Sequence, residues 1–285
     1  MTLRLREGRI EDAEPCGRIC WDAFRNIAAQ HNFPADIPSA EAGIAVVGMM
    51  LRHPRFYAIV AELDGRVVGS NFADERSAIV GVGPITVAPD VQDRAVGREL
   101  MSNVFDRQAA RGTPGTRLVQ LAYNTRSLSL YTKLGFDTRE PLSVMQGTPP
   151  AVRLPGRAVR TAVRGDLAAC NRLCFTVHGH HRGGEVEESI AHGTATVVER
   201  DGSITGYATL IGWMGHAVAE TNGDLEALIA AAPSYPGLGF LVPTRNGELL
   251  RWCLAHGLRL VVNANLMTIG LYNEPRAAWL PSVLY

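Results

Sequence analysis

An internal repeat constrains this chain more than any other feature, because three short segments of its first half recur in the same order in its second half. The matched segments are residues 12–21 with 166–175, 62–69 with 199–206, and 124–136 with 246–258. The chain has 285 residues, which is enough for two domains of about 140 residues each. The sequence therefore predicts two copies of one folding plan.

The repeated segments predict the same elements in both copies. Asp12 and Asp166 each precede apolar residues at helical spacing, which is typical of a helix N-cap. Asp-Gly pairs at 64–65 and 201–202 separate apolar runs and predict tight β-hairpins. In the first half we expect strands at residues 56–61, 67–72, 79–87 and 118–123 and helices at 95–111 and 127–134. Each half is then an α/β (α+β) unit with a mixed, mostly antiparallel sheet flanked by helices.

Residues 146–156 separate the two halves, because three prolines within them break any regular element. We predict one domain at residues 1–148 and a second at 157–285. The closing segment 272–285 is aromatic and apolar, so we expect it to pack on the sheet of the second domain.

Composition narrows the range of partners. Lys+Arg and Asp+Glu both number 28, so the basic excess typical of nucleic-acid-binding proteins is absent. The first ten residues contain no apolar run and do not resemble a signal peptide, and the longest apolar stretch, 44–51, is too short to span a bilayer. Cysteines at i, i+4 spacing, as at 16 and 20, are expected in the core and not in a zinc or redox motif. We expect a protein of the reducing cytoplasm with no nucleic-acid or membrane partner.

The strongest chemical motif is the segment 85–98, in which a strand ends at Pro89 and a helix follows. Small residues at Ala95 and Gly97 leave successive backbone N–H groups uncovered, which forms an anion site at a helix N-terminus. Arg94 and Arg98 add positive charge. The alternative is an ordinary strand–helix loop in which small residues allow close packing.

A second motif favours the first interpretation. The turn Gln92-x-x-Ala95-x-Gly97, followed by Asn124-x-x-Ser127-x-x-x-Tyr131-x-x-Leu134-Gly135-Phe136, resembles the GNAT superfamily of N-acetyltransferases over about residues 3–145. The resemblance implies acetyl-CoA as cosubstrate, with its pyrophosphate on the turn and its pantetheine arm along the backbone of Val87, beside Asn124 and Ser127. The cofactor-binding residues it implies are Val87, Gln92, Asp93, Arg94, Ala95, Val96, Gly97, Arg98, Asn124 and Ser127.

The same resemblance implies that Tyr131 protonates the leaving thiolate. A phenol of pKa about 10 is protonated at neutral pH and can supply that proton; the alternative is a core aromatic residue. Two positions depart from the family pattern: Ala95 replaces a usual glycine, and Val119 stands where some members place a catalytic glutamate. Asp74 and Glu75 are candidates for recognising the amine or for acting as a general base, with a solvated turn as the alternative.

The second copy lacks this machinery. Cys253 aligns with Tyr131, no phosphate turn precedes Asn246, and Asn246 itself is expected to cap a helix. We therefore expect a degenerate copy with a structural or substrate-shaping role. Residues 178–181 contain three histidines but no cysteine or carboxylate at ligand spacing, so we expect a polar loop and no metal.

These observations predict an enzyme that moves an acetyl group from acetyl-CoA to a primary amine of a small molecule or peptide. Two alternatives stay open: a catalytically idle CoA-binding sensor or scaffold, and a structural interaction module that binds no CoA. The acceptor and the oligomeric state are left open.

Overall fold

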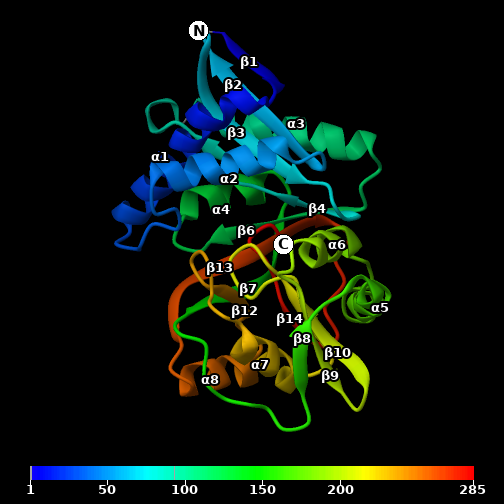
Figure 1. Ribbon diagram of the computed structural model, residues 1–285. Helices are drawn as coiled ribbons and strands as arrows, with labels where there is room; N and C mark the ends of the chain where they lie inside the picture. The colour runs from blue at the N-terminus through cyan, green and yellow to red at the C-terminus, as the bar shows by residue number, and fades with distance from the viewer. Residues whose placement is uncertain (1, 93) are drawn as a thin grey trace. The chain divides into compact units, whose positions relative to one another are not determined.

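The computed structural model describes residues 2–92 and 94–285, and its elements repeat in order along the chain (Figure 1). The first half contains β1 (Leu3–Glu7), η1 (Ile10–Asp12), α1 (Ala13–Gln30), α2 (Ala40–Arg52), β2 (Phe56–Leu63), β3 (Arg66–Asp74), β4 (Ile79–Val82), β5 (Thr86–Val87), η2 (Pro89–Val91), α3 (Val96–Ala110), β6 (Gly115–Leu121), α4 (Thr125–Lys133) and β7 (Asp137–Gln146). The second half contains β8 (Ala158–Thr161), η3 (Arg164–Asp166), α5 (Leu167–His178), α6 (Gly183–Ala191), β9 (Thr196–Arg200), β10 (Ser203–Ala208), β11 (Ala217–Ala219), α7 (Asn222–Ala231), β12 (Phe240–Pro243), α8 (Gly247–Ala255), β13 (Arg259–Gly270) and β14 (Ala278–Leu280). Within residues 157–285, all of which are described, no counterpart of β5 and η2 occurs.

The two copies begin with the same local structure. Asp12 accepts hydrogen bonds from both ends of the Arg6 guanidinium at 2.7 and 2.8 Å, and Asp166 accepts the same pair from Arg160 at 2.6 and 3.0 Å. Each carboxylate also accepts the backbone N–H three residues earlier in the chain. Both aspartates occupy the N-cap position, as predicted, but neither side chain caps its helix, because the carboxylate is bound to the arginine. These hydrogen bonds hold the pKa of Asp12 and of Asp166 below the usual value.

The predicted hairpins are confirmed. Asp64 and Gly65 have φ of 49° and 83°, and Asp201 and Gly202 have φ of 51° and 74°. Two successive residues with positive φ form the tight turn that matches the twist of paired strands. β2 pairs with β3 and β9 pairs with β10, both antiparallel.

Contacts between residues divide the chain into two compact units: Met1–Glu75 with Ile79–Thr116, and Arg76–Ala78 with Arg117–Tyr285. In the first unit, strands run in the order β1-β2-β3-β4, with β5 also paired to β3. Helices α1 and α2 pack on each other, and α3 packs on β3 and β2. The expected strand at residues 79–87 is interrupted between β4 and β5; Pro84 lies in the gap and, lacking an N–H, cannot donate to a ladder.

In the second unit, β7 lies between β13 and β12 and pairs antiparallel with both. A strand assigned by sequence to the first domain thus pairs with strands of the second repeat (Figure 1). A second sheet runs in the order β14-β11-β10-β9-β8. A buried apolar cluster joins β7 and β12 to α7, α8 and this second sheet. β14 pairs with β11, which confirms that the closing segment packs on a sheet.

Several smaller predictions have clear outcomes. All five cysteines are free and buried. The predicted loop at residues 178–181 is present at 179–181, but it is not a solvated polar loop throughout, because His178 ends α5 with 2% of its surface exposed and His180 is also buried. Over the described part of the chain, no group of three or more His, Cys, Asp or Glu side chains is placed to hold a metal ion. Nor is any helix in that part long and apolar enough to cross a membrane.

Candidate functional site

The turn before α3 is folded by its own backbone and by Gln92. β5 lies against β3 at Gly69, where a Cβ atom would come within 2.6 Å of the Thr86 carbonyl oxygen. After β5, Gln92 Nε2 donates a hydrogen bond to the Val87 carbonyl at 3.1 Å. The glutamine predicted to mark a phosphate turn therefore bridges back to the strand that precedes it. Asp93, predicted as part of the same turn, lies outside the described residues.

Helix α3 starts from Ala95, which has φ of 62° and ψ of 2° in the left-handed region. No side chain of the described residues caps this helix, whereas Val96, with 2% of its surface exposed, anchors its first turn in the core. Arg94 and Arg98 are both exposed at the helix start. A 15-residue helix without a side-chain cap presents N–H groups and the positive end of its dipole, a combination suited to binding an anion.

Asn124 begins helix α4 in the second unit. Its Oδ1 accepts the backbone N–H of Ser127 at 3.1 Å, and Ser127 Oγ donates to the Asn124 carbonyl at 2.9 Å. The buried amide of Gln120 donates to that carbonyl at 2.7 Å and to Ser127 Oγ at 3.1 Å. Asn124 Nδ2 has no partner in residues 2–92 and 94–285 and is therefore free to donate to a ligand. Sequence reasoning missed Gln120, whose only signal is its position on the strand that leads into this cap.

Tyr131 lies on α4 with 8% of its surface exposed, and its ring packs edge-on against Phe136 at a centroid distance of 5.9 Å. Burial raises the pKa of Tyr131 above its ordinary value, so the phenol stays protonated at neutral pH. Its hydroxyl has no hydrogen-bond partner on the described parts of the chain. The Tyr131 hydroxyl proton is therefore not engaged in a hydrogen bond with any described residue.

Asp74 and Glu75 lie at the end of β3 and just beyond it. The solvated turn considered as an alternative is wrong, because Asp74 is 5% exposed and the Glu75 side chain 7%. Arg107 donates to both Glu75 oxygens at 2.7 and 2.9 Å, and Gln108 Nε2 donates at 3.0 Å. Burial raises the pKa of Glu75, but these hydrogen bonds outweigh it and leave the pKa below its usual value. Glu75 is therefore a poor proton acceptor.

In the second copy, side chains of the chain itself occupy the starts of α7 and α8, the helices equivalent to α3 and α4. Thr221 caps α7 by accepting the backbone N–H of Asp224, and the Asp224 carboxylate is fully buried within 3.0 Å of Arg157 and 3.4 Å of Arg200. Asn246 caps α8 as Asn124 caps α4, as predicted. Its Nδ2, however, donates to an Asn222 side chain at 2.8 Å, so it is not free.

Residues 54–138 match the family model described as the acetyltransferase (GNAT) domain. A structure from Pyrococcus horikoshii named as an acetyltransferase is similar with a TM-score of 0.74 and 18% identity, over 96% of this chain and 91% of that one. A GCN5-related N-acetyltransferase from Sphaerobacter thermophilus has a TM-score of 0.65 and 16% identity, over 95% and 96% of the two chains. A tandem GNAT protein of the clavulanic acid biosynthesis pathway has a TM-score of 0.54 and 16% identity, over 94% and 98%. A search of curated protein sequences found no match.

Proposed function

We propose that this chain transfers an acetyl group from acetyl-CoA to a primary amine of a small molecule or peptide, because residues 54–138 match the acetyltransferase (GNAT) domain and the fold is similar to that of a tandem GNAT protein. The observation that carries this proposal is the start of α3 at Ala95, beside Arg94 and Arg98, where no side chain of residues 2–92 and 94–285 caps the helix. A phosphate bound there receives backbone hydrogen bonds and the favourable end of the helix dipole.

The GNAT resemblance implies two parts of a CoA site, the turn before α3 and the start of α4. The pyrophosphate binds the backbone amides between Asp93 and Arg98, and the pantetheine arm runs along the backbone of Val87. Asn124 donates its free Nδ2 to the same arm, with Ser127 beside it. Backbone N–H groups and the two arginines meet the charge of the phosphates in this proposal.

The proposed reaction is a direct attack of the amine nitrogen on the thioester carbonyl carbon. As the carbon–sulfur bond breaks, Tyr131 Oη gives its proton to the departing thiolate, and the proton lost by the amine passes to solvent. Solvent then returns a proton to the phenolate. The hydroxyl of Tyr131, which has no hydrogen-bond partner on the described parts of the chain and stays protonated at neutral pH, supports its role as a proton donor.

We assign catalysis to the proposed domain at residues 1–148 and a structural or substrate-shaping role to residues 157–285. The start of α7 supports this division, because the Thr221 side chain already accepts the backbone N–H of Asp224 there, and the buried Asp224 carboxylate is already paired with Arg157 and Arg200. One CoA per chain is therefore expected.

Isothermal titration calorimetry with CoA tests the site. We expect one CoA per chain for the native protein and no binding for Gly97→Asp, because that carboxylate would stand among the amides that meet the phosphate. Gly165→Asp is the matched control: a Cβ atom at Gly165 meets nothing within 4 Å, so this variant should bind as the native protein does. Two sites per chain, or native affinity in Gly97→Asp, would contradict the assignment.

A catalytically idle CoA-binding sensor is the second candidate, and the full engagement of Glu75 by Arg107 and Gln108 favours it by removing one carboxylate base. Release of free thiol from acetyl-CoA in the presence of a panel of amines separates the two. CoA binding without thiol release from any amine would favour the sensor.

A further inference from the structure

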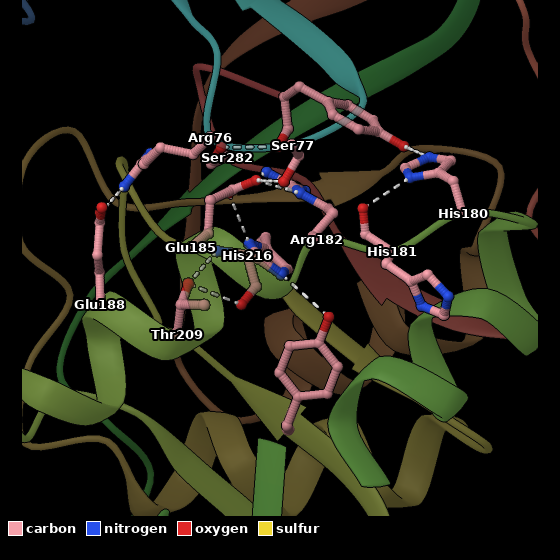
Figure 2. Close-up of polar contacts among 12 residues, drawn as sticks. Arg76, Ser77, His180, His181, Arg182, Glu185, Glu188, Thr209, His216 and Ser282 are labelled. Atoms are coloured by element: carbon pink, nitrogen blue, oxygen red, sulfur yellow. Dashed lines mark hydrogen bonds and ion pairs between the residues drawn. The ribbon is translucent and has the colours of Figure 1, made fainter. Parts of the chain in front are cut away.

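A buried ion pair between Arg182 and Glu185 lies in the second unit (Figure 2). Arg182, with 3% of its surface exposed, donates through Nε and Nη2 to the two oxygens of Glu185 at 2.9 and 2.5 Å. Ser77 Oγ donates to Glu185 at 3.2 Å, and His216 Nδ1 lies 3.2 Å from the same carboxylate. The charge of this buried guanidinium is therefore balanced by a carboxylate in contact with it.

Arg117, on β6, is buried more deeply and lacks such a partner. It is 1% exposed, and its Nε and Nη2 atoms are both buried without a hydrogen-bond partner anywhere in the described ranges 2–92 and 94–285. Its guanidinium carbon lies 3.9 Å from the centre of the Tyr285 ring and 5.2 Å from that of Tyr272. Burial, and then the nearby charge of Arg182, lower the pKa of Arg117 to about 9, which leaves it protonated at neutral pH.

The two aromatic rings do not satisfy this cation. A ring face attracts the positive charge, but it accepts no hydrogen bond from the N–H groups along the edge of the guanidinium. The Tyr272 hydroxyl is itself buried without a partner in the same described ranges. Buried polar groups in folded proteins are almost always hydrogen-bonded, and a buried charge left unpaired is costly. Arg117 and Tyr272 are therefore groups that a bound ligand would satisfy.

The geometry of the free atoms selects the ligand. Nε and Nη2 lie on one edge of the guanidinium, and their two N–H groups point the same way, as a fork that matches both oxygens of one carboxylate. The net charge also fits, because Glu185 neutralises Arg182, and burial lowers the pKa of His180 to about 4, which keeps it uncharged. The Arg117 guanidinium is thus the one positive charge left uncompensated in this group of residues. A carboxylate, with a single negative charge, matches it better than a phosphate dianion does.

We propose that Arg117 binds the carboxylate group of a small-molecule ligand through Nε and Nη2. This further step rests on the proposed function: the ligand at Arg117 is taken as the acceptor, which is then an amine that also carries a carboxylate, as free amino acids do. Tyr272 and Tyr285, whose rings lie over the guanidinium, are the side chains that a ligand at Arg117 would contact.

Calorimetry in the absence of CoA tests the proposal with free amino acids, the matching amino acid amides, acetate and phosphate. We expect at least one amino acid to bind at least 10-fold more tightly than its amide, and Arg117→Met to lose this preference. Arg139→Met is the matched control: Arg139 also lies over the Tyr272 ring, at 5.5 Å, but is paired with Asp137, so this variant should keep the preference. Equal binding of acids and amides, persistence of the preference in Arg117→Met, or binding of phosphate alone would overturn the site.

Thermal unfolding adds a readout that is independent of the ligand. Arg117→Met removes an unpaired buried charge and should unfold at or above the native temperature, whereas Arg182→Met strands Glu185 and should unfold several degrees lower. A large loss of stability in Arg117→Met would show that the guanidinium is structural and would overturn the proposal. Amino acid binding without acetyl transfer would refute the proposed function alone. Equal acetylation of amino acids and amides, unchanged in Arg117→Met, would refute the carboxylate site alone.

Discussion

Ala95 is a residue under backbone strain at the centre of the proposed phosphate site. Its φ of 62° lies in the left-handed region, which costs an L-residue with a Cβ atom roughly 1–2 kcal/mol. Glycine removes this strain but loses about 0.4–1 kcal/mol through the greater freedom of the unfolded chain. Ala95→Gly should therefore stabilise the protein by roughly 0.5–1 kcal/mol, which raises the Tm by about 1–3 °C in a chain of this size.

The control is the same substitution at Ala88, which has an ordinary φ of −53° and is buried. There, glycine brings only entropy loss and the loss of a buried methyl group, so Ala88→Gly should destabilise the protein by roughly 1–2 kcal/mol. Differential scanning calorimetry of both variants measures the opposite signs. If Ala95→Gly lowers the Tm as much as Ala88→Gly does, the left-handed conformation of Ala95 does not exist in solution and the strain is absent.

Two further predictions concern Tyr131 and pH. Tyr131→Phe should lower kcat by roughly 10-fold or more at unchanged CoA affinity, because a proton donor acts mainly in the transition state; normal turnover would refute the donor role, and Cys253→Ser should leave turnover intact. Burial lowers the pKa of His216 from 6.5 to about 4, so between these values the unfolded chain binds a proton that the folded chain does not. Stability should therefore fall on going from pH 7 to pH 5, by about 2 kcal/mol from this group alone, as measured by urea unfolding. An unfolding free energy that is the same at both pH values would contradict the neutral, buried state of His216.

Features encoded within a few residues could be predicted from the sequence. The Asp-Gly turns at 64–65 and 201–202 follow from the ease with which glycine, and to a lesser degree aspartate, adopts positive φ. The caps at Asn124 and Asn246 follow from a side-chain oxygen that reaches the backbone N–H three residues on. Each of these depends on local geometry, so the same short sequence forms the same structure in both halves.

Features that depend on distant partners could not be predicted in the same way. The pairing of β7 with β13 joins residues more than a hundred positions apart, and neither strand specifies the other. Arg6 on β1 and Arg160 on β8 would be expected from the sequence to lie in solvent. The structure instead pairs them with Asp12 and Asp166. The burial of Arg117 is the hardest feature to predict, because arginine is rarely buried and the neighbouring residues in the sequence do not indicate that this one is.

The two copies also show how one fold can keep or lose an anion site. Helix α3 starts from a strained alanine and has no side-chain cap from the described residues, whereas α7 starts from Thr221, and its Asp224 lies between two arginines. The second arrangement is the more stable one by ordinary rules of capping and charge pairing. Strain and unsatisfied N–H groups persist in a folded protein where a ligand makes use of them, and they mark functional sites more often than well-capped helices do. We therefore place CoA in the first copy, where the start of the helix is the less stable of the two.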